Sequence, residues 1–136
     1  MAQRSRRKPV PRNRTIQYQK VAEHFFVAAK HALQLEYWTA AGVLIVHSAI
    51  AYADALCVKQ SGQKSSGENH EDAVALLEEV VAGGEEKERA INQLRRIIEE
   101  KTKMSYLGDL FTARQADELW KRLERFRDWA VSVLER

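Results

Sequence analysis

The chain has 136 residues, of which 45% are hydrophobic, so it is long enough for one folded domain with one core and too short for two. Only 6 Gly and 2 Pro are present, which disfavours an all-β protein with many tight turns. The formal net charge is +3, but residues 1–14 hold six basic and no acidic side chains, so the remainder carries a net charge of −3. These values exclude a domain that is basic over its whole surface.

The N-terminal residues 1–14 contain Pro9 and Pro11 among basic and polar side chains, which predicts a flexible arm ahead of a single domain at 15–136. A cluster of cations without acids attracts phosphates, so this arm is a candidate for binding RNA or DNA without base specificity. The cations are Arg4, Arg6, Arg7, Lys8, Arg12 and Arg14. The alternative is a solubilising tail that has no partner.

Two helices are predicted next. Apolar residues at steps of three and four predict a first helix from about Thr15 to Leu35. A second helix, with Thr39 as a possible N-cap, runs to about Lys59 and is apolar nearly all round. Its length suggests a membrane span, but a charged Asp54 inside a lone span would be costly. We therefore expect a buried central helix and no membrane contact.

The second half of the chain predicts three more helices. A polar loop at 61–69 ends at Asn69, which is a plausible N-cap for a third helix that Gly83 and Gly84 terminate. A fourth helix runs from about residue 85 to 103, followed by a connector at 104–111. Thr112 and Gln115 form a capping box for the last helix. The expected fold is all-α, an up-and-down bundle of about five helices with no convincing strand.

Few residues in the sequence suggest a catalytic or ligand-binding role. The chain has no glycine-rich phosphate loop, HExxH, CxxC or GxSxG motif, and we expect neither a cofactor nor a metal site. The single cysteine, Cys57, fits a reducing, cytoplasmic setting. His47 and Asp54 lie seven residues apart on the second helix, roughly 10 Å along its axis, so each needs its own partner. They are either satisfied polar groups in the core or members of a polar seam at a subunit interface or cleft.

His70 is the histidine that most resembles a functional residue. It opens a helix directly after a glycine-containing loop that carries Lys64. A histidine there is able to act as a general acid or base if its surroundings hold its protonation state. The alternative is a solvated histidine in the first turn of a helix.

Residues 15–134 resemble the HEPN superfamily of small α-helical bundles. The similar features are the alanine-rich helix AGVLIVHSAIAYADALCV, the polar loop, the Asn69-His70 helix start, the Tyr106 connector, and a last helix that begins FTARQADELW and ends ERFRDWAVSVL. The resemblance implies pairing of two copies through their helices. It also implies one of two functional classes: metal-independent ribonucleases, or non-catalytic modules that often act beside a nucleotidyltransferase partner.

The ribonuclease signature of this superfamily is an arginine, four to six intervening residues, and a histidine. Upstream of His70 the corresponding positions hold Ser65, Lys64 and Gln63. Lysine supplies a cation but lacks the bidentate fork with which arginine binds phosphate. We therefore expect a non-catalytic interaction module. The alternative is a metal-independent endoribonuclease in which Lys64 replaces the arginine and His70 is the acid or base.

A degenerate site of this kind would consist of Lys64, Asn69 and His70, with Asp54 contributing across an interface. We also expect a homodimer, because a domain of this size has too little other structure to bury both the apolar second helix and the aromatic residues near the helix ends. These aromatic residues are Tyr37, Trp38, Tyr106 and Phe111.

Overall fold

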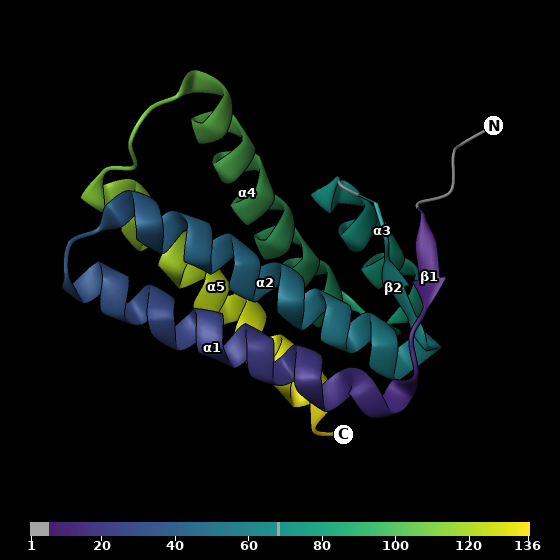
Figure 1. Ribbon diagram of the computed structural model, residues 1–136. Coiled ribbons are helices and arrows are strands. Elements are labelled where there is room, and N and C mark those ends of the chain that lie inside the picture. Colours follow the sequence, from purple (N-terminus) through teal and green to yellow (C-terminus); the bar gives the residue numbers. More distant parts are fainter. Residues whose placement is uncertain (1–5, 68) are drawn as a thin grey trace.

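The computed structural model describes residues 6–67 and 69–136, and in these residues it contains five α-helices and one short antiparallel sheet (Figure 1). The expected all-α bundle is confirmed. The helices are α1 (Thr15–Gln34), α2 (Trp38–Ser61), α3 (His70–Val80), α4 (Glu85–Leu107) and α5 (Ala113–Leu134), and the strands are β1 (Arg7–Pro9) and β2 (Gln63–Ser65), with a 3-10 turn, η1 (Arg12–Arg14), after β1.

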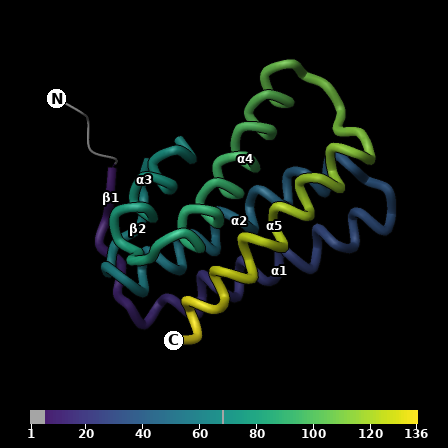
Figure 2. The backbone as a smooth tube through the Cα atoms, turned by 180° about the vertical axis from the view of Figure 1, so that it is seen from behind, coloured from purple at the N-terminus to yellow at the C-terminus, as the bar shows by residue number. Residues whose placement is uncertain are grey.

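Helix α2 is the central element of the bundle. It packs against α1, α3, α4 and α5, and Figure 2, seen from the far side, shows α5 in front of it. Its side chains are buried around most of the helix, from Ala41 to Val58, and Tyr52 is the largest of those fully buried. By length and composition α2 is also able to cross a membrane, but 78% of its most apolar segment is buried inside the bundle. That burial is typical of a core helix, as the sequence predicts.

The helix boundaries agree with most of the predicted caps. The Asn69 side chain accepts a hydrogen bond from the Glu71 amide at 2.9 Å, and Thr112 and Gln115 form the expected reciprocal capping box. Three boundaries differ. Helix α3 ends at Val80 with Val81 as its C-cap, so Gly83 and Gly84 do not terminate it, and Gly84 is the N-cap of α4. Thr39 does not cap α2, because its hydroxyl instead accepts a hydrogen bond from the Phe111 amide at 3.0 Å. Helix α4 also extends four residues into the expected connector and ends at Gly108, which has a positive φ of 70°.

The prediction of a flexible arm over 1–14 is wrong for the part of it that the structure describes, residues 6–14. Residues 7–9 pair with β2, and Val10 is buried, with only 8% of its surface exposed. The Arg12 guanidinium donates hydrogen bonds to the carbonyls of Lys59 and Gln60 at the end of α2. The segment is ordered because these contacts satisfy backbone groups and bury an apolar side chain.

The sheet was not expected, since three-residue strands leave almost no pattern in a sequence. Its register pairs Lys8 with Lys64, and flanking bonds run from the Val10 amide to Gly62 and from the Ser66 amide to Arg6. The alternation of these bonds directs the nitrogen of Pro9 away from β2, so the missing N–H group costs no hydrogen bond in the ladder.

A polar network joins three helices beside the core. Tyr52 on α2 donates a hydrogen bond to Glu23 on α1, and Arg127 on α5 donates to the Tyr52 hydroxyl at 2.9 Å. Arg127 also holds both carboxylate oxygens of Glu23, at 2.9 and 3.0 Å, and lies 4.4 Å over the ring of Phe26. The Tyr52 hydroxyl and both carboxylate oxygens of Glu23 therefore have partners, as buried polar groups require.

Candidate functional site

The four candidate residues of the degenerate site lie around the C-terminal half of α2 and the start of α3. Asp54 is buried on α2, with 8% of its surface exposed, and Lys64 reaches it from β2 with Nζ 3.8 Å from Oδ2. The same ammonium donates to the Ser65 carbonyl at 3.3 Å. The structure therefore pairs Lys64 with Asp54, which the spacing of these residues in the sequence does not reveal.

Asp54 has an unusual acidity. Burial raises the pKa of its carboxyl group to about 6, and the nearby charges of Lys64 and Lys8 oppose that rise only in part. Lys8 belongs to β1, so the ordered N-terminal strand contributes directly to the electrostatics of this carboxylate. The result is a side chain that is mostly ionised at pH 7 and protonated below pH 6.

His70 occupies the first position of α3 and is half-buried, while Asn69 before it is exposed. Burial lowers the pKa of His70, and the charges of Lys101 and His47 lower it further. A neutral imidazole at pH 7 is a competent proton acceptor. The two charges that lower the pKa of His70 come from Lys101 and His47, whereas the ammonium of Lys64 is paired with Asp54.

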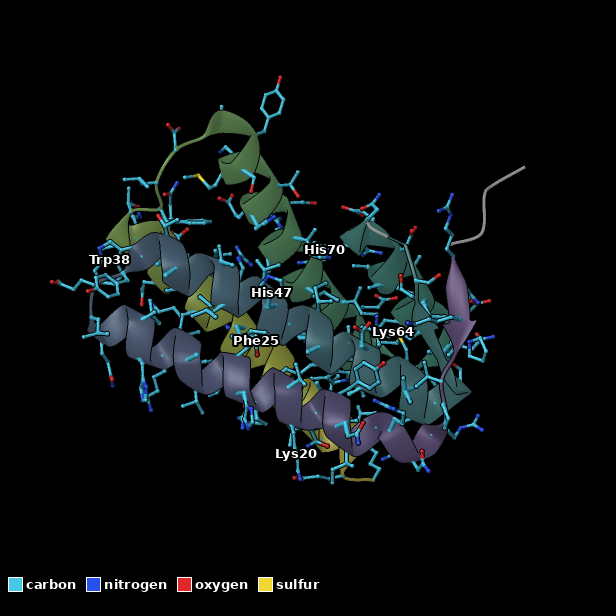
Figure 3. The ribbon with its side chains drawn as sticks, in the orientation of Figure 1. Lys20, Phe25, Trp38, His47, Lys64 and His70 are labelled. Carbon is cyan, nitrogen blue, oxygen red and sulfur yellow. The ribbon has the colours of Figure 1, made fainter. Side chains whose placement is uncertain are left out.

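His47 acts on His70 from another helix, a relation that the spacing of the two residues in the sequence does not reveal. It is exposed on α2 and stacks on Phe25 of α1, with ring centroids 5.3 Å apart. Figure 3 shows His47 between Phe25 of α1 and His70 at the start of α3, with Lys64 on β2 nearer the C-terminal end of α2. His47 and Asp54 thus differ: the histidine is exposed, and only the aspartate is a buried polar group paired across elements.

The basic N-terminal residues have separate surroundings. Arg7 pairs with Glu79 on α3, and Arg12 binds the end of α2. Arg6, Lys8 and Arg14 are exposed. Arg4 lies outside the described residues. These exposed cations thus stand on a folded segment, and Lys8 among them pairs in the sheet with Lys64 and acts on Asp54.

The described residues hold neither a reactive cysteine nor a cluster of metal ligands. Cys57 is buried, and burial together with the charge of Asp54 raises the pKa of its thiol, which makes it unreactive. No three His, Cys, Asp or Glu side chains converge anywhere in the described ranges 6–67 and 69–136.

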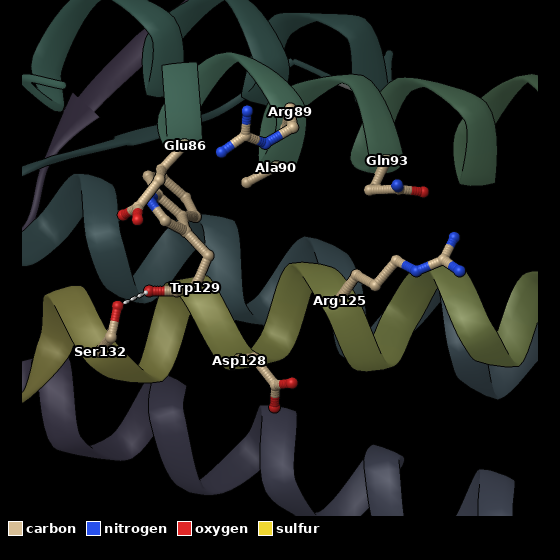
Figure 4. Close-up of a pocket in the computed structure, with 8 residues that line it drawn as sticks. All are labelled: Glu86, Arg89, Ala90, Gln93, Arg125, Asp128, Trp129 and Ser132. Atoms are coloured by element: carbon tan, nitrogen blue, oxygen red, sulfur yellow. Dashed lines mark hydrogen bonds between the residues drawn. The ribbon is translucent and has the colours of Figure 1, made fainter. Parts of the chain in front are cut away.

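A hollow of about 380 Å³ lies between α4 and α5 (Figure 4). Its lining residues are Glu86, Arg89, Ala90, Gln93, Arg125, Asp128, Trp129 and Ser132. Two carboxylates and two guanidinium groups share this lining, so their charges offset one another and no one sign of ligand is favoured.

These features define the chain as a small α-helical bundle with a histidine at the start of α3 and no arginine at the ribonuclease spacing. A family model described as the HEPN domain matches residues 17–134. The chain therefore belongs to the HEPN family. Comparisons with curated proteins and with solved structures gave no match.

Proposed function

We propose that this HEPN domain is an interaction module that does not cleave RNA. The proposal rests on one observation: Nζ of Lys64, the only cation at the motif spacing, lies 3.8 Å from the Asp54 carboxylate and donates to the Ser65 carbonyl. A cation held by a buried carboxylate is a poor stabiliser of charge developing on a phosphate beside the histidine. Lysine also lacks the fork of arginine.

The first partner in this proposal is a second copy of the chain. Along α2, the stripe of Val43, His47 and Ile50 remains at least partly exposed between α1 and the α3–α4 side. These positions follow steps of three and four, so they form one continuous, mainly apolar face. A self-complementary pairing of this face would cover it in both copies. A nucleotidyltransferase-type protein is a further partner that the family membership suggests.

The second partner is nucleic acid, bound through phosphates. Arg6, Lys8 and Arg14 are exposed on an ordered segment, so binding would not require that segment to fold first. No aromatic side chain stands among residues 6–14 to stack on bases, which favours binding that is indifferent to sequence and steeply dependent on salt.

The alternative function is the metal-independent endoribonuclease. The observation in its favour is the lowered pKa of His70, which keeps the imidazole neutral and able to accept a proton at pH 7. Incubating the purified chain with single-stranded RNA in the presence of EDTA separates the two functions. The interaction module leaves the RNA intact. Cleavage that His70→Ala abolishes and Asn13→Ala retains would establish the ribonuclease instead.

Binding to nucleic acid is tested with two variants of equal charge. The first replaces Arg6, Lys8 and Arg14 with glutamine, and the second replaces the exposed cations Arg89, Arg114 and Lys121, which lie on α4 and α5. Fluorescence anisotropy with a single-stranded oligonucleotide at two salt concentrations gives the affinities. We expect about tenfold weaker binding at low salt for the first variant. Equal losses in both variants would show that only net charge matters.

A further inference from the structure

A second hollow lies at the opposite end of α2 from Asp54. It has a volume of about 380 Å³ and opens where the α1–α2 turn meets the connector between α4 and α5. Its lining residues are Glu36, Tyr37, Trp38, Thr39, Ala40, Leu110 and Phe111. Trp38 and Asp54 are sixteen residues apart on one helix, a rise of about 24 Å, so this hollow is separate from the site around His70. Figure 3 shows Trp38 at this end of the bundle.

The walls of the hollow are held in place by specific contacts. The Phe111 amide donates to the Thr39 hydroxyl at 3.0 Å, which ties the connector to the first turn of α2. A Cβ atom on Gly42 would lie 2.6 Å from the Phe111 ring, so only glycine allows the ring to pack this closely. Glu36 has a positive φ of 61°, and its amide donates to the Leu33 carbonyl at 3.1 Å. The turn and the connector therefore present a preformed surface.

The chemistry of the lining favours a cation. Three of its side chains, Tyr37, Trp38 and Phe111, are aromatic, and aromatic faces attract positive charge. Glu36 is the only charged residue in the lining, and it has no ion pair within the described part of the chain. The partial negative charge at the end of α1 and the partial positive charge at the start of α2 meet in this turn and offset one another. The carboxylate thus dominates the local field.

We propose that this hollow binds an arginine side chain of a partner protein. A planar guanidinium group is able to stack on an aromatic ring and to donate two parallel hydrogen bonds to the Glu36 carboxylate. Exposed apolar side chains form a rim here: Tyr37 and Leu110 of the lining are 62% and 78% accessible, and Leu35, next in sequence to Glu36, is 63% accessible. A free small cation would leave this rim uncovered, whereas a peptide with apolar residues beside its arginine would cover it.

The test uses two matched peptides, acetyl-Leu-Arg-Leu-amide and the same peptide with citrulline, which keeps the shape of arginine but carries no charge. Binding is followed by the NMR signal of the Trp38 indole N–H, assigned with Trp38→Phe. We expect a saturable shift with the arginine peptide and about fivefold weaker binding of the citrulline peptide. Equal affinity of the two peptides would overturn the proposal.

Two variants locate the interaction. Glu36→Asn removes the carboxylate while keeping a residue type that tolerates the positive φ, and Tyr37→Leu removes an aromatic ring while keeping apolar bulk. Each variant should bind the arginine peptide about fivefold more weakly. The control Glu124→Gln, at an exposed position on α5, should bind it with unchanged affinity. Unchanged binding in both Glu36→Asn and Tyr37→Leu, with wild-type amide spectra, would refute the site.

A third arm tests the nature of the occupant. Guanidinium ion alone, at low millimolar concentration, should bind about fivefold more weakly than the arginine peptide, because it cannot cover the apolar rim. If the free ion binds as tightly as the peptide, the rim contributes nothing and the hollow is not a protein-docking site. The readout is the Trp38 signal and not RNA cleavage or oligonucleotide binding, so this proposal succeeds or fails independently of the proposed function.

Discussion

At the scale of single residues, Asp54 is the side chain whose ionisation matters most. Its folded-state pKa of about 6 lies above the ordinary value of 3.8, so the folded protein binds this proton more tightly than the unfolded chain does. The tighter binding of this proton stabilises the folded state fully below pH 4. This stabilisation is lost as the pH rises through 6, and it is absent at pH 7. At neutral pH the buried, ionised carboxylate lowers the free energy of unfolding, and the pairing with Lys64 offsets this loss only in part.

We therefore predict that Asp54→Asn raises the free energy of unfolding at pH 7, by on the order of 1 to 2 kcal/mol once the lost ion pair is counted. The gain should shrink as the pH falls from 6 to 4. Urea denaturation at pH 4, 6 and 7.5 measures both effects. A variant less stable than wild type at pH 7.5 would mean that the pair with Lys64 outweighs the cost of burying the charge.

A second prediction concerns the polar network at Arg127. Arg127→Met keeps much of the side-chain bulk but leaves the Glu23 carboxylate without its cation and Tyr52 without its donor. Because the cluster is half-buried, we expect a loss of stability of about 2 kcal/mol. Arg125→Met, an exposed position on the same helix, is the control and should change stability little. Thermal and urea unfolding of both variants decide the matter.

At the scale of secondary-structure elements, β1 and η1 act as a strap across the ends of α2 and α3. Removing residues 1–14 eliminates the pairing with β2, the burial of Val10 and the contact of Arg12 with the end of α2. We predict a loss of about 2 kcal/mol, mainly from the apolar side chain and the exposed ladder groups of β2. Chemical denaturation of the truncated chain measures it.

The control for this truncation is the variant with glutamine at Arg6, Lys8 and Arg14, which keeps the backbone pairing and should stay within about 0.5 kcal/mol of wild type. If the truncated chain is as stable as the full chain, the sheet contributes nothing to the fold. Because the truncation removes both the cations and the strand pairing, a loss of oligonucleotide binding in the truncated chain alone would not distinguish missing charge from a disturbed fold.

At the scale of the whole molecule, the open stripe of α2 predicts a two-fold dimer. Light scattering at high micromolar concentration should give about twice the chain mass of 15.6 kDa. Val43→Glu, which places a charge on the stripe, should give monomers, whereas Val27→Glu on the outer face of α1 should not. A monomeric wild-type chain, or equal dissociation by both variants, would contradict this interface.

The sequence by itself determined the helices, their caps at Asn69 and Thr112, and the central position of α2. These features depend on local periodicity and on hydrogen bonds within a few residues, which the chain order displays directly. The family resemblance followed from the same core spacing. The candidate residues Asp54, Lys64, Asn69 and His70 were also identifiable, because unusual polar groups on apolar helices and at helix starts are visible in the sequence.

Only the tertiary structure decided how these residues combine. The partner of Lys64 is ten residues away on another element, and His47 and Lys101 approach His70 only through the packing of α2, α3 and α4. The ordered strand at Arg7–Pro9 depends on a partner strand more than fifty residues later, so its own sequence reads as a flexible arm. Long-range contacts of this kind have no local signal, since their stability comes from surfaces that exist only after the helices have packed.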